Sequence, residues 1–196
     1  MQAQLEHGFE SASGFWDAFK RTLGAPPSRA GAVRCLYAQW IDTPLGAMLA
    51  LADDEGLHLL EFVDRRALET EVAQLRKRLP CAIVPGHHAH LATIAAELKA
   101  YFEGRSLDFT VPLAIRGSAF EERVWARLRA IPPGETRSYA EIARQTGNAG
   151  AVRAVGRANG RNRIALAIPC HRVIRADGEL CGYGGGVWRK KWLLDH

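Results

Sequence analysis

The chain has 196 residues, of which 47% are hydrophobic and 24% charged, and its formal net charge is +5. That length allows one or two domains with their own cores, and the composition excludes a disordered chain. No apolar run is long enough to cross a membrane, there is no signal peptide, and the four cysteines are widely spaced, so we expect a soluble cytoplasmic protein with reduced thiols.

Residues 1–30 contain one predicted helix. Phe15, Phe19 and Leu23 are four residues apart and therefore lie on one face of a helix, which Gly24 and the prolines after it would end. A single helix cannot bury its own apolar stripe, so this segment must pack on something else.

Residues 33–115 are interpreted as a small mixed domain. Apolar runs separated by turn residues predict strands, and apolar residues at helical spacing predict helices. The predicted strands cover residues 33–41, 47–52, 57–63 and 82–84, and the predicted helices cover residues 66–79 and 88–103.

Three histidines, His87, His88 and His90, stand at the start of the second of these helices. A metal site is one interpretation of such a cluster. No cysteine or carboxylate lies nearby at ligand spacing, so we favour a helix-start cluster and expect no metal and no cofactor.

Residues 118–196 are interpreted as a second domain, which begins with the capping box Ser118-x-x-Glu121. The helix that follows ends at the Pro-Pro-Gly of residues 132–134. Helices over residues 139–146 and 151–158, joined by a turn that contains glycine, predict a helix-turn-helix.

The second helix of this motif combines small residues with arginines. Ala151, Ala154 and Gly156 would let its backbone approach a surface closely, and Arg153 and Arg157 can contact phosphates. Tight packing on a neighbouring helix is the alternative. This second domain holds 14 Lys/Arg against 7 Asp/Glu. The charge indicates nucleic acid as the partner, although a solvated basic surface would look the same.

The tetrapeptide Pro169-Cys170-His171-Arg172 follows the apolar run 164–168, which we predict to be a strand. A strand that ends in proline would deliver the Cys170 thiol to a fixed place, with the His171 imidazole beside it to remove its proton. The alternative is a buried cysteine that fills a gap in the core.

Several motifs at fixed spacing give residues 33–196 a resemblance to the alkylguanine-DNA alkyltransferases. The stretch Pro169-Cys170-His171-Arg172-Val173 looks like the active-site signature of that family. The other matching motifs are Ser138-Tyr139, Arg153-Ala154-Val155-Gly156, Asn162, Gly182-Tyr183-x-Gly185-Gly186 and Trp192-Leu193-Leu194.

Within that family the chain most resembles the Ada-type subgroup, in which an AraC-like DNA-binding domain precedes the alkyltransferase. Asn148 and the run 157–162 carry this likeness. Residues 8–27 resemble the last helix and tail of the AraC-like domain, so residues 1–30 would be a remnant of that domain and its linker. The zinc-binding module of full-length Ada-type proteins has no counterpart in the sequence.

The resemblance implies an α/β (α+β) fold with two domains. Residues 33–115 would form a small ribonuclease-H-like mixed sheet domain that supports its neighbour and has no site of its own. Residues 118–196 would form the helical DNA-binding domain with the helix-turn-helix and the active-site cysteine. The implied partner is double-stranded DNA that contains O6-alkylguanine, or O4-alkylthymine, bound by a monomer.

The resemblance also implies a role for each matching residue. Cys170 would accept the alkyl group, His171 would act as general base through a water, and Tyr139 would hydrogen-bond the guanine ring. The implied DNA-binding residues are Arg153, Tyr139, Ala151, Ala154, Gly156 and Arg157. The implied substrate pocket consists of Val173, Tyr183, Gly184, Gly185 and Asn159, and the implied structural residues are Asn162 and Arg172.

Further details of the site follow from the same resemblance. Arg153 would fill the stack that a flipped base leaves. The backbone carbonyls of Cys170 and Val173 would read the guanine amino group, and a backbone N–H near Gly184 would donate to the departing oxygen. The glycines at 184–186 would give their loop freedom to accept a bulky base.

The sequence departs from the family pattern at one place. In the family a glutamate follows the Trp-Leu-Leu-x-His motif and orients the histidine, whereas this sequence ends at His196. We expect the terminal carboxylate of His196, or Asp195, to take the place of that glutamate beside His171.

Two other functions compete with repair. A DNA-lesion sensor or regulator of the alkylation response, as part of an Ada-like protein, would bind damage without removing it, and such relatives lack the cysteine. A cysteine hydrolase would need a histidine placed across a cleft with its own acid, whereas here cysteine and histidine are sequence neighbours. Cys170 therefore favours a single, stoichiometric alkyl transfer, because the thioether product is inert at neutral pH.

Overall fold

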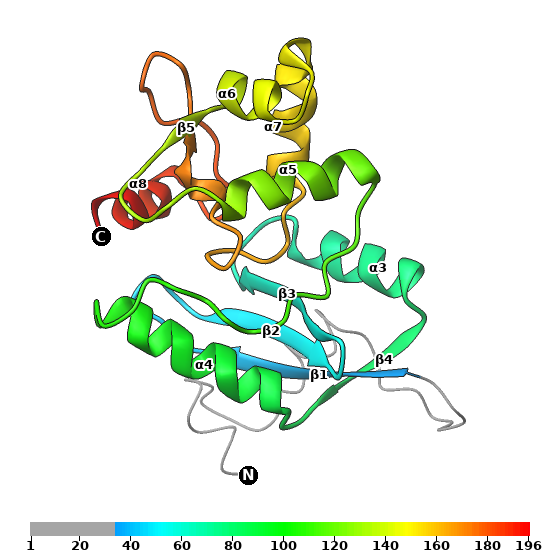
Figure 1. Cartoon of the computed structure of the whole chain (residues 1–196). Helices are drawn as coiled ribbons and strands as arrows, with labels where there is room; N and C mark the ends of the chain where they lie inside the picture. The colour runs from blue at the N-terminus through cyan, green and yellow to red at the C-terminus, as the bar shows by residue number, and fades with distance from the viewer. Residues whose placement is uncertain (1–33) are drawn as a thin grey trace.

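The computed structural model describes residues 34–196. The helix and the AraC-like remnant expected in residues 1–30 lie outside the described residues. Figure 1 shows a sheet with its helices in the lower part of the molecule and a group of helices above it. We call residues 34–115 the sheet half and residues 118–196 the helical half.

The sheet half is built on four strands in the order β3-β2-β1-β4. The pairs β1–β2 and β2–β3 are antiparallel, and β1–β4 is parallel. The strands are β1 (Arg34–Ile41), β2 (Met48–Asp53), β3 (Gly56–Phe62) and β4 (Cys81–Pro85). All four strands predicted from the apolar runs are therefore confirmed, with no end shifted by more than one residue.

The two predicted helices of the sheet half cover opposite faces of the sheet. The buried residues of α3 (Leu68–Arg78) form one apolar cluster with Leu59, and those of α4 (Ala89–Phe102) form another with the next residue, Leu60. Because both faces are covered, every residue of β2 and β3 is buried. This explains why these strands read as apolar runs rather than as an alternating pattern.

The histidine cluster marks the start of α4, as the sequence predicted. His88 is the N-cap residue, and its Nδ1 accepts a hydrogen bond from the backbone N–H of His90 at 3.2 Å. The ring of His90 in turn lies 2.8 Å from the carbonyl oxygen of Asp53. Among residues 34–196, no group of three or more His, Cys, Asp or Glu side chains is placed to hold a metal ion.

The helical half contains short elements joined by turns. Ser118 and Ser138 each form a complete capping box, at the starts of α5 and α6. A 3-10 turn leads from α6 into α7, so the predicted helix-turn-helix is present. The elements are α5 (Ala119–Arg129), β5 (Arg137–Ser138), α6 (Tyr139–Gln145), η1 (Ala149–Ala151), α7 (Val152–Gly160), η2 (Cys170–Arg172), β6 (Val173–Ile174) and α8 (Val187–Asp195).

The strand predicted for residues 164–168 is wrong. This segment is a tight turn, in which Ile168 N–H donates to the carbonyl of Ile164 at 3.1 Å. The run is apolar because every residue in it is buried, and burial alone does not distinguish a strand from a buried turn. The backbone enters η2 at Cys170 directly from this turn.

The free edge of β3 is covered by two segments from outside the sheet. Leu57 exchanges backbone hydrogen bonds with the chain at Pro112 and Ala114. Leu60 N–H donates to the carbonyl of Arg163 at 2.9 Å, and its carbonyl accepts from Ala165 N–H at 2.8 Å. The turn that leads to Cys170 is therefore bonded to the edge of the sheet.

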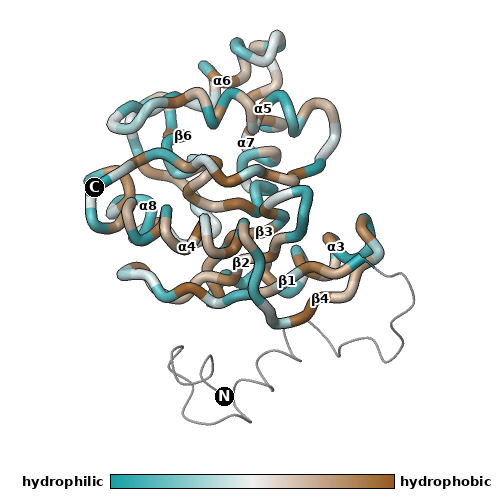
Figure 2. Tube along the Cα trace, turned by 60° about the horizontal axis from the view of Figure 1, so that its bottom comes forward, coloured by the Kyte–Doolittle hydropathy of each residue, from teal (hydrophilic) through white to brown (hydrophobic). Residues whose placement is uncertain are grey.

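A single apolar cluster runs from the sheet into the helical half. It includes residues of β2, β3 and α4 together with residues of α5, α6 and α7. Figure 2 shows hydrophobic residues along the strands and in the segments between sheet and helices. Within the described part of the chain, no helix has both the length and the hydrophobicity that a membrane span requires.

Candidate active site and DNA-binding helix

The backbone before Cys170 is strained. Leu166 has a φ of 64° and is the one non-glycine residue with a positive φ among residues 34–196. Its side chain is buried, so the surrounding core holds it in this conformation at a cost of about 1–3 kcal/mol. After Leu166 the backbone bends again, so that the backbone nitrogen of Cys170 lies 2.7 Å from the carbonyl oxygen of Ile168 and donates to it.

Asn162 holds this turn from inside. Its Nδ2 lies within hydrogen-bond distance of the carbonyls of Ile164 (3.3 Å) and Ile168 (2.9 Å), and its Oδ1 accepts from Ile164 N–H at 3.0 Å. The same Nδ2 lies 3.2 Å from Cys170 Sγ. The sequence suggested a supporting role for Asn162. Its contact with the sulfur also lowers the pKa of the Cys170 thiol.

Burial keeps the Cys170 thiol protonated at neutral pH. Burial raises the pKa of the thiol to about 11, and the charge of Glu61 adds to the rise. The hydrogen bond from Asn162 and the charges of Arg65 and Lys190 lower the pKa but do not outweigh burial. The thiol therefore needs a base before it can act as a nucleophile.

His171 is a neutral imidazole next to this thiol in the chain. Burial, with the positive charges of Arg172 and Lys190, lowers the pKa of His171 to about 3. The ring is 1% exposed, and neither of its nitrogens has a hydrogen-bond partner among the described residues. One nitrogen of a neutral ring carries a lone pair that can accept a proton, as a general base requires, although the lowered pKa makes this ring a weak base.

The expected carboxylate partner of His171 is not present in the structure. Asp195 pairs with Lys191 at 2.6 Å on the surface, and the ring of His196 donates to the carbonyl of Tyr101 at 2.8 Å. Because both nitrogens of His171 are unpartnered, the hypothesis that Asp195 or the terminal carboxylate orients this ring is wrong. The physical reason for Asp195 is that α8 turns its side chain to the surface, where it pairs with Lys191.

A short ladder ties the start of α6 to the segment after Cys170. Residues of β5 and β6 pair in parallel, Arg137 with Val173 and Ser138 with Ile174. Tyr139 follows directly, and its hydroxyl lies 3.5 Å from Cys181 Sγ. Burial, and then contact with Cys181, raises the pKa of Tyr139, so this phenol stays protonated and can donate. A two-residue ladder has no sequence pattern, and the sequence analysis missed both the ladder and Cys181.

The loop after Cys181 packs closely against its surroundings. The hydroxyl of Tyr183 is buried and has no partner among the described residues, and its ring meets that of His171 edge-on with centroids 6.5 Å apart. A Cβ at Gly184 would lie 2.3 Å from an Arg65 nitrogen, and one at Gly185 would lie 2.9 Å from Phe62. At Gly184 and Gly185 a larger side chain would meet these neighbours, whereas the freedom of the loop stays a prediction.

The two carbonyls expected to read a guanine amino group already accept hydrogen bonds. The carbonyl of Cys170 accepts from Val173 N–H and from Asn159 Nδ2, the latter at 3.4 Å. The carbonyl of Val173 accepts from Lys190 Nζ at 2.6 Å. Lys190 is fully buried, and the sequence analysis did not single it out. Arg172 donates to the carbonyl of Ile131 and so joins this turn to the end of α5.

The helix α7 presents arginines to solvent. Arg153 and Arg157 are exposed, whereas Ala151, Ala154 and Gly156 are half-buried. The inner face of the helix is fixed to the core through its buried residues, and Trp125 Nε1 donates to the carbonyl of Ala158 at 2.9 Å. One side of α7 is therefore packed and the other carries the basic and small residues expected for contact with DNA.

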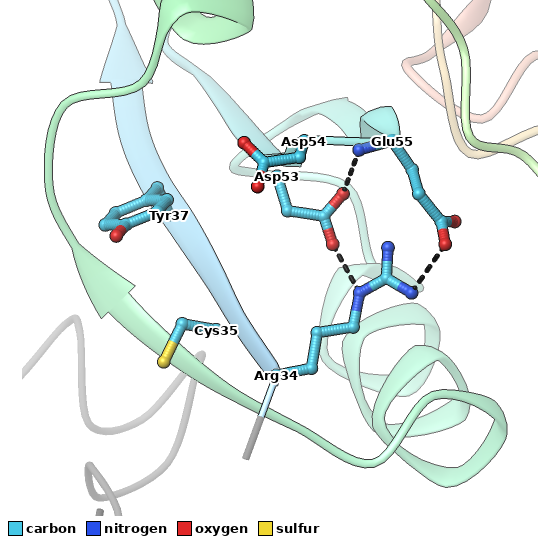
Figure 3. A pocket seen from close by; sticks show the side chains of 6 residues that line it. All are labelled: Arg34, Cys35, Tyr37, Asp53, Asp54 and Glu55. Atoms are coloured by element: carbon cyan, nitrogen blue, oxygen red, sulfur yellow. Dashed lines mark hydrogen bonds and ion pairs between the residues drawn. The ribbon is translucent and has the colours of Figure 1, made fainter. Parts of the chain in front are cut away.

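A separate pocket of about 420 Å³ lies in the sheet half, away from these residues (Figure 3). Arg34 points into it between Asp53 and Glu55 and forms ion pairs with both. Burial raises the pKa of Asp53, but its hydrogen bonds with Arg34 and His58 outweigh burial and lower that pKa to about 2. Arg34 therefore balances only part of the negative charge of the three carboxylates that line this pocket, Asp53, Asp54 and Glu55.

Comparison with known proteins places both halves in one family. The family profile described as "6-O-methylguanine DNA methyltransferase, ribonuclease-like domain" matches residues 36–115. The profile described as "6-O-methylguanine DNA methyltransferase, DNA binding domain" matches residues 119–196.

Curated relatives and solved structures agree with these matches. A methylated-DNA–protein-cysteine methyltransferase of Mycobacterium leprae is 41% identical over 160 residues, which cover 82% of this chain and 91% of that protein. One from Mycolicibacterium paratuberculosis is 45% identical over 154 residues, 79% of this chain and 87% of that protein. The crystal structure of the Mycobacterium tuberculosis O6-methylguanine methyltransferase is 42% identical, with a TM-score of 0.69, and the match covers 82% of this chain and 91% of that one. A crystal structure of that species' protein in complex with DNA matches with the same identity and TM-score, over 81% of this chain and 91% of that one.

Proposed function

The chain belongs to the 6-O-methylguanine DNA methyltransferase family, and from this premise we propose that Cys170 accepts the alkyl group of O6-alkylguanine in double-stranded DNA. Its relatives are named for the transfer of methyl groups from DNA to a protein cysteine. One observation carries the assignment to Cys170. Its thiol is protonated and buried, and the next residue in the chain is a neutral histidine with unpartnered nitrogens.

The proposed reaction is a displacement at the alkyl carbon. His171, through a water, takes the proton of the Cys170 thiol. The thiolate then attacks the alkyl carbon, so that the S–C bond forms as the C–O6 bond breaks. The electron pair of the broken bond goes to the guanine, which is stabilised by a hydrogen bond from Tyr139 and a backbone N–H near Gly184. The proton taken from the thiol ends on the guanine, and charge is balanced.

The alkylated base must leave the duplex before it can reach a buried thiol. We assign this step to α7, where Arg153 would fill the vacated stack and Arg157 would contact the backbone. The same geometry would accept O4-alkylthymine. A thioether is inert at neutral pH, so each molecule reacts once. We also propose that the protein acts as a monomer.

Intact-protein mass spectrometry tests this proposal. After mixing with duplex DNA that holds one O6-methylguanine, the protein should gain the mass of one methyl group, and peptide mapping should place it on Cys170. Cys170→Ser should bind the duplex without any mass change. Cys181→Ser, at a half-buried cysteine near the same site, is the matched control and should still be methylated.

The same experiment separates the competing functions. Binding by the wild-type protein without a mass change would indicate a lesion sensor. A methyl group on a cysteine other than Cys170 would contradict the assignment.

A further inference from the structure

Arg65 reaches from the sheet half into the helical half. It stands in the connection between β3 and α3, and its side chain is 9% exposed. Its Nη1 lies 2.5 Å from Glu61 Oε2, and its Nη2 lies 2.6 Å from Glu71 Oε1. The same Nη2 donates to the carbonyl of Gly160, the last residue of α7, at 3.1 Å.

The guanidinium of Arg65 also lies against the loop that holds Tyr183. A Cβ built on Gly184 would be 2.3 Å from Arg65 Nη1 and 2.5 Å from its Cζ. A side chain at position 184 would have to displace the guanidinium, because the guanidinium lies against the loop backbone at Gly184. Arg65 thus touches the end of the proposed recognition helix and the wall of the proposed pocket at once.

The charge of Arg65 acts on Cys170. Burial lowers the pKa of Arg65, but the charges of Glu61 and Glu71 outweigh burial and raise it, so the guanidinium is always positive. Burial raises the pKa of Glu61 to about 7, against the charge of Arg65. The titratable or charged groups that interact with the thiol are Glu61, Arg65, Lys190, Tyr139 and Tyr183. Arg65 and Lys190 are the two cations among these groups, and each favours the thiolate.

We propose that Arg65 is a positioning residue for alkyl transfer, which fixes the Tyr183–Gly185 loop against the end of α7 and supplies positive charge to the Cys170 thiolate. This inference rests on the proposed function. It also changes the interpretation of the sheet half, which the sequence analysis treated as a support without a site. The sheet half supplies Arg65 together with the two carboxylates that hold it in place.

Single-turnover kinetics with O6-methylguanine duplex test the proposal. Arg65→Gln should lower the limiting rate of methyl transfer by about tenfold or more, with little change in the dissociation constant for DNA. Arg65→Lys keeps the charge but loses the planar fork, so it should recover part of the rate. Arg66→Gln is the matched control, because Arg66 is the next residue and is exposed. It should react at the wild-type rate.

A second measurement separates the effect of charge from that of folding. The ultraviolet absorbance of the thiolate, taken as the difference from the same variant with Cys170→Ser, reports ionisation of Cys170 directly. At one alkaline pH, Arg65→Gln should show less thiolate than wild type, whereas Arg65→Lys and Arg66→Gln should match wild type. Arg65→Gln leaves the carboxylates of Glu61 and Glu71 unpaired, so the double variant Arg65→Gln/Glu71→Gln, which removes one of these charges and leaves Glu61 beside the thiol, should keep the fold and still react at least about fivefold more slowly.

Two results would overturn the inference. Wild-type rates and thiolate content in Arg65→Gln would show that the residue has no role in the reaction. A folded double variant with the wild-type rate would show that Arg65 serves stability alone. If wild type and Arg66→Gln also fail to transfer the methyl group, the proposed function itself is wrong, and the two failures are thereby distinguished.

Discussion

The sheet half and the helical half keep their shapes through different interactions. In the sheet half, β2 and β3 are buried at every residue, and paired apolar strands define the structure. In the helical half, the turn around Cys170 depends on polar side chains that bond to the backbone, namely Asn162, Arg172 and Lys190. We therefore expect apolar substitutions in the sheet half to change stability alone. Polar substitutions in the helical half should change stability and reaction rate together.

Asn162→Ala should have the largest combined effect. It leaves the N–H of Ile164 without its partner and removes the hydrogen bond that lowers the pKa of Cys170. We expect a loss of about 3 kcal/mol in the free energy of unfolding and a transfer rate reduced about tenfold or more. Urea denaturation and single-turnover kinetics measure the two quantities. Gln74→Ala, at an exposed amide of α3, is the control and should change neither.

Leu60→Ala should lower the free energy of unfolding by as much as Asn162→Ala does, without slowing methyl transfer. Leu60 is fully buried, so the substitution creates a cavity and should lower the free energy of unfolding by about 3 kcal/mol. Its backbone hydrogen bonds to Arg163 and Ala165 remain, so the active-site turn keeps its anchor. The rate per folded molecule should stay within about twofold of wild type. A tenfold slower rate would show that side-chain packing in the sheet half also positions the thiol.

The two capping boxes offer a finer comparison inside the helical half. Ser118→Ala and Ser138→Ala each remove a helix cap. Each should lower the free energy of unfolding by about 1 kcal/mol, as measured by thermal or urea denaturation. Ser138 precedes Tyr139 and lies in the β5–β6 ladder, whereas Ser118 lies at the start of α5. Transfer should therefore slow in Ser138→Ala and not in Ser118→Ala. Equal rates in the two variants would argue against the ladder as a positioning element.

The pH dependence of the rate should be the smallest effect. Burial places the pKa of Cys170 at about 11 and that of His171 at about 3, away from their ordinary values of 9.0 and 6.5. In the proposed reaction the proton stays within the site, so the rate should vary by less than about threefold from roughly pH 5 to pH 9. Single-turnover rates across this range check the expectation. Because burial raises the pKa of Glu61 to about 7 and its charge acts on Cys170, only an inflection near pH 6.5 that persists in Glu61→Gln would show that His171 titrates normally.

The free energy of unfolding should depend on pH, although the rate of methyl transfer should not. As the pH falls from 6.5 toward 3, the unfolded chain takes up a proton on His171 that the folded protein does not. The free energy of unfolding should therefore fall over this window. His171→Gln should reduce that slope in urea denaturation at each pH.

The elements of the sheet half were predictable because burial on both faces leaves a continuous apolar signal. The four strands, α3 and α4 all follow from such runs and from helical spacing. The capping boxes at Ser118 and Ser138 made the starts of α5 and α6 equally clear, although the sequence analysis named the first alone.

The parts of the site that were not predicted lack any local pattern. The segment 164–168 is apolar but turns sharply, because Asn162 supplies the hydrogen bonds that a neighbouring strand would otherwise supply. The hydrogen bonds of Lys190 to Val173 and of Arg65 to Gly160 join residues that are far apart in the chain. Neither the spacing nor the composition of a sequence reports such contacts. The pairing of Cys170 with His171 could be predicted because the two residues are adjacent in the sequence.

The pairing of Leu60 with Arg163 and Ala165 has a consequence for dissecting the protein. If residues 34–115 were produced alone, β3 would present bare amide and carbonyl groups at Leu60, next to the apolar side chain of Leu59. Such an edge recruits strands from other copies, so the isolated fragment should self-associate. A genetic split of this chain would thus yield an aggregating piece rather than a working module.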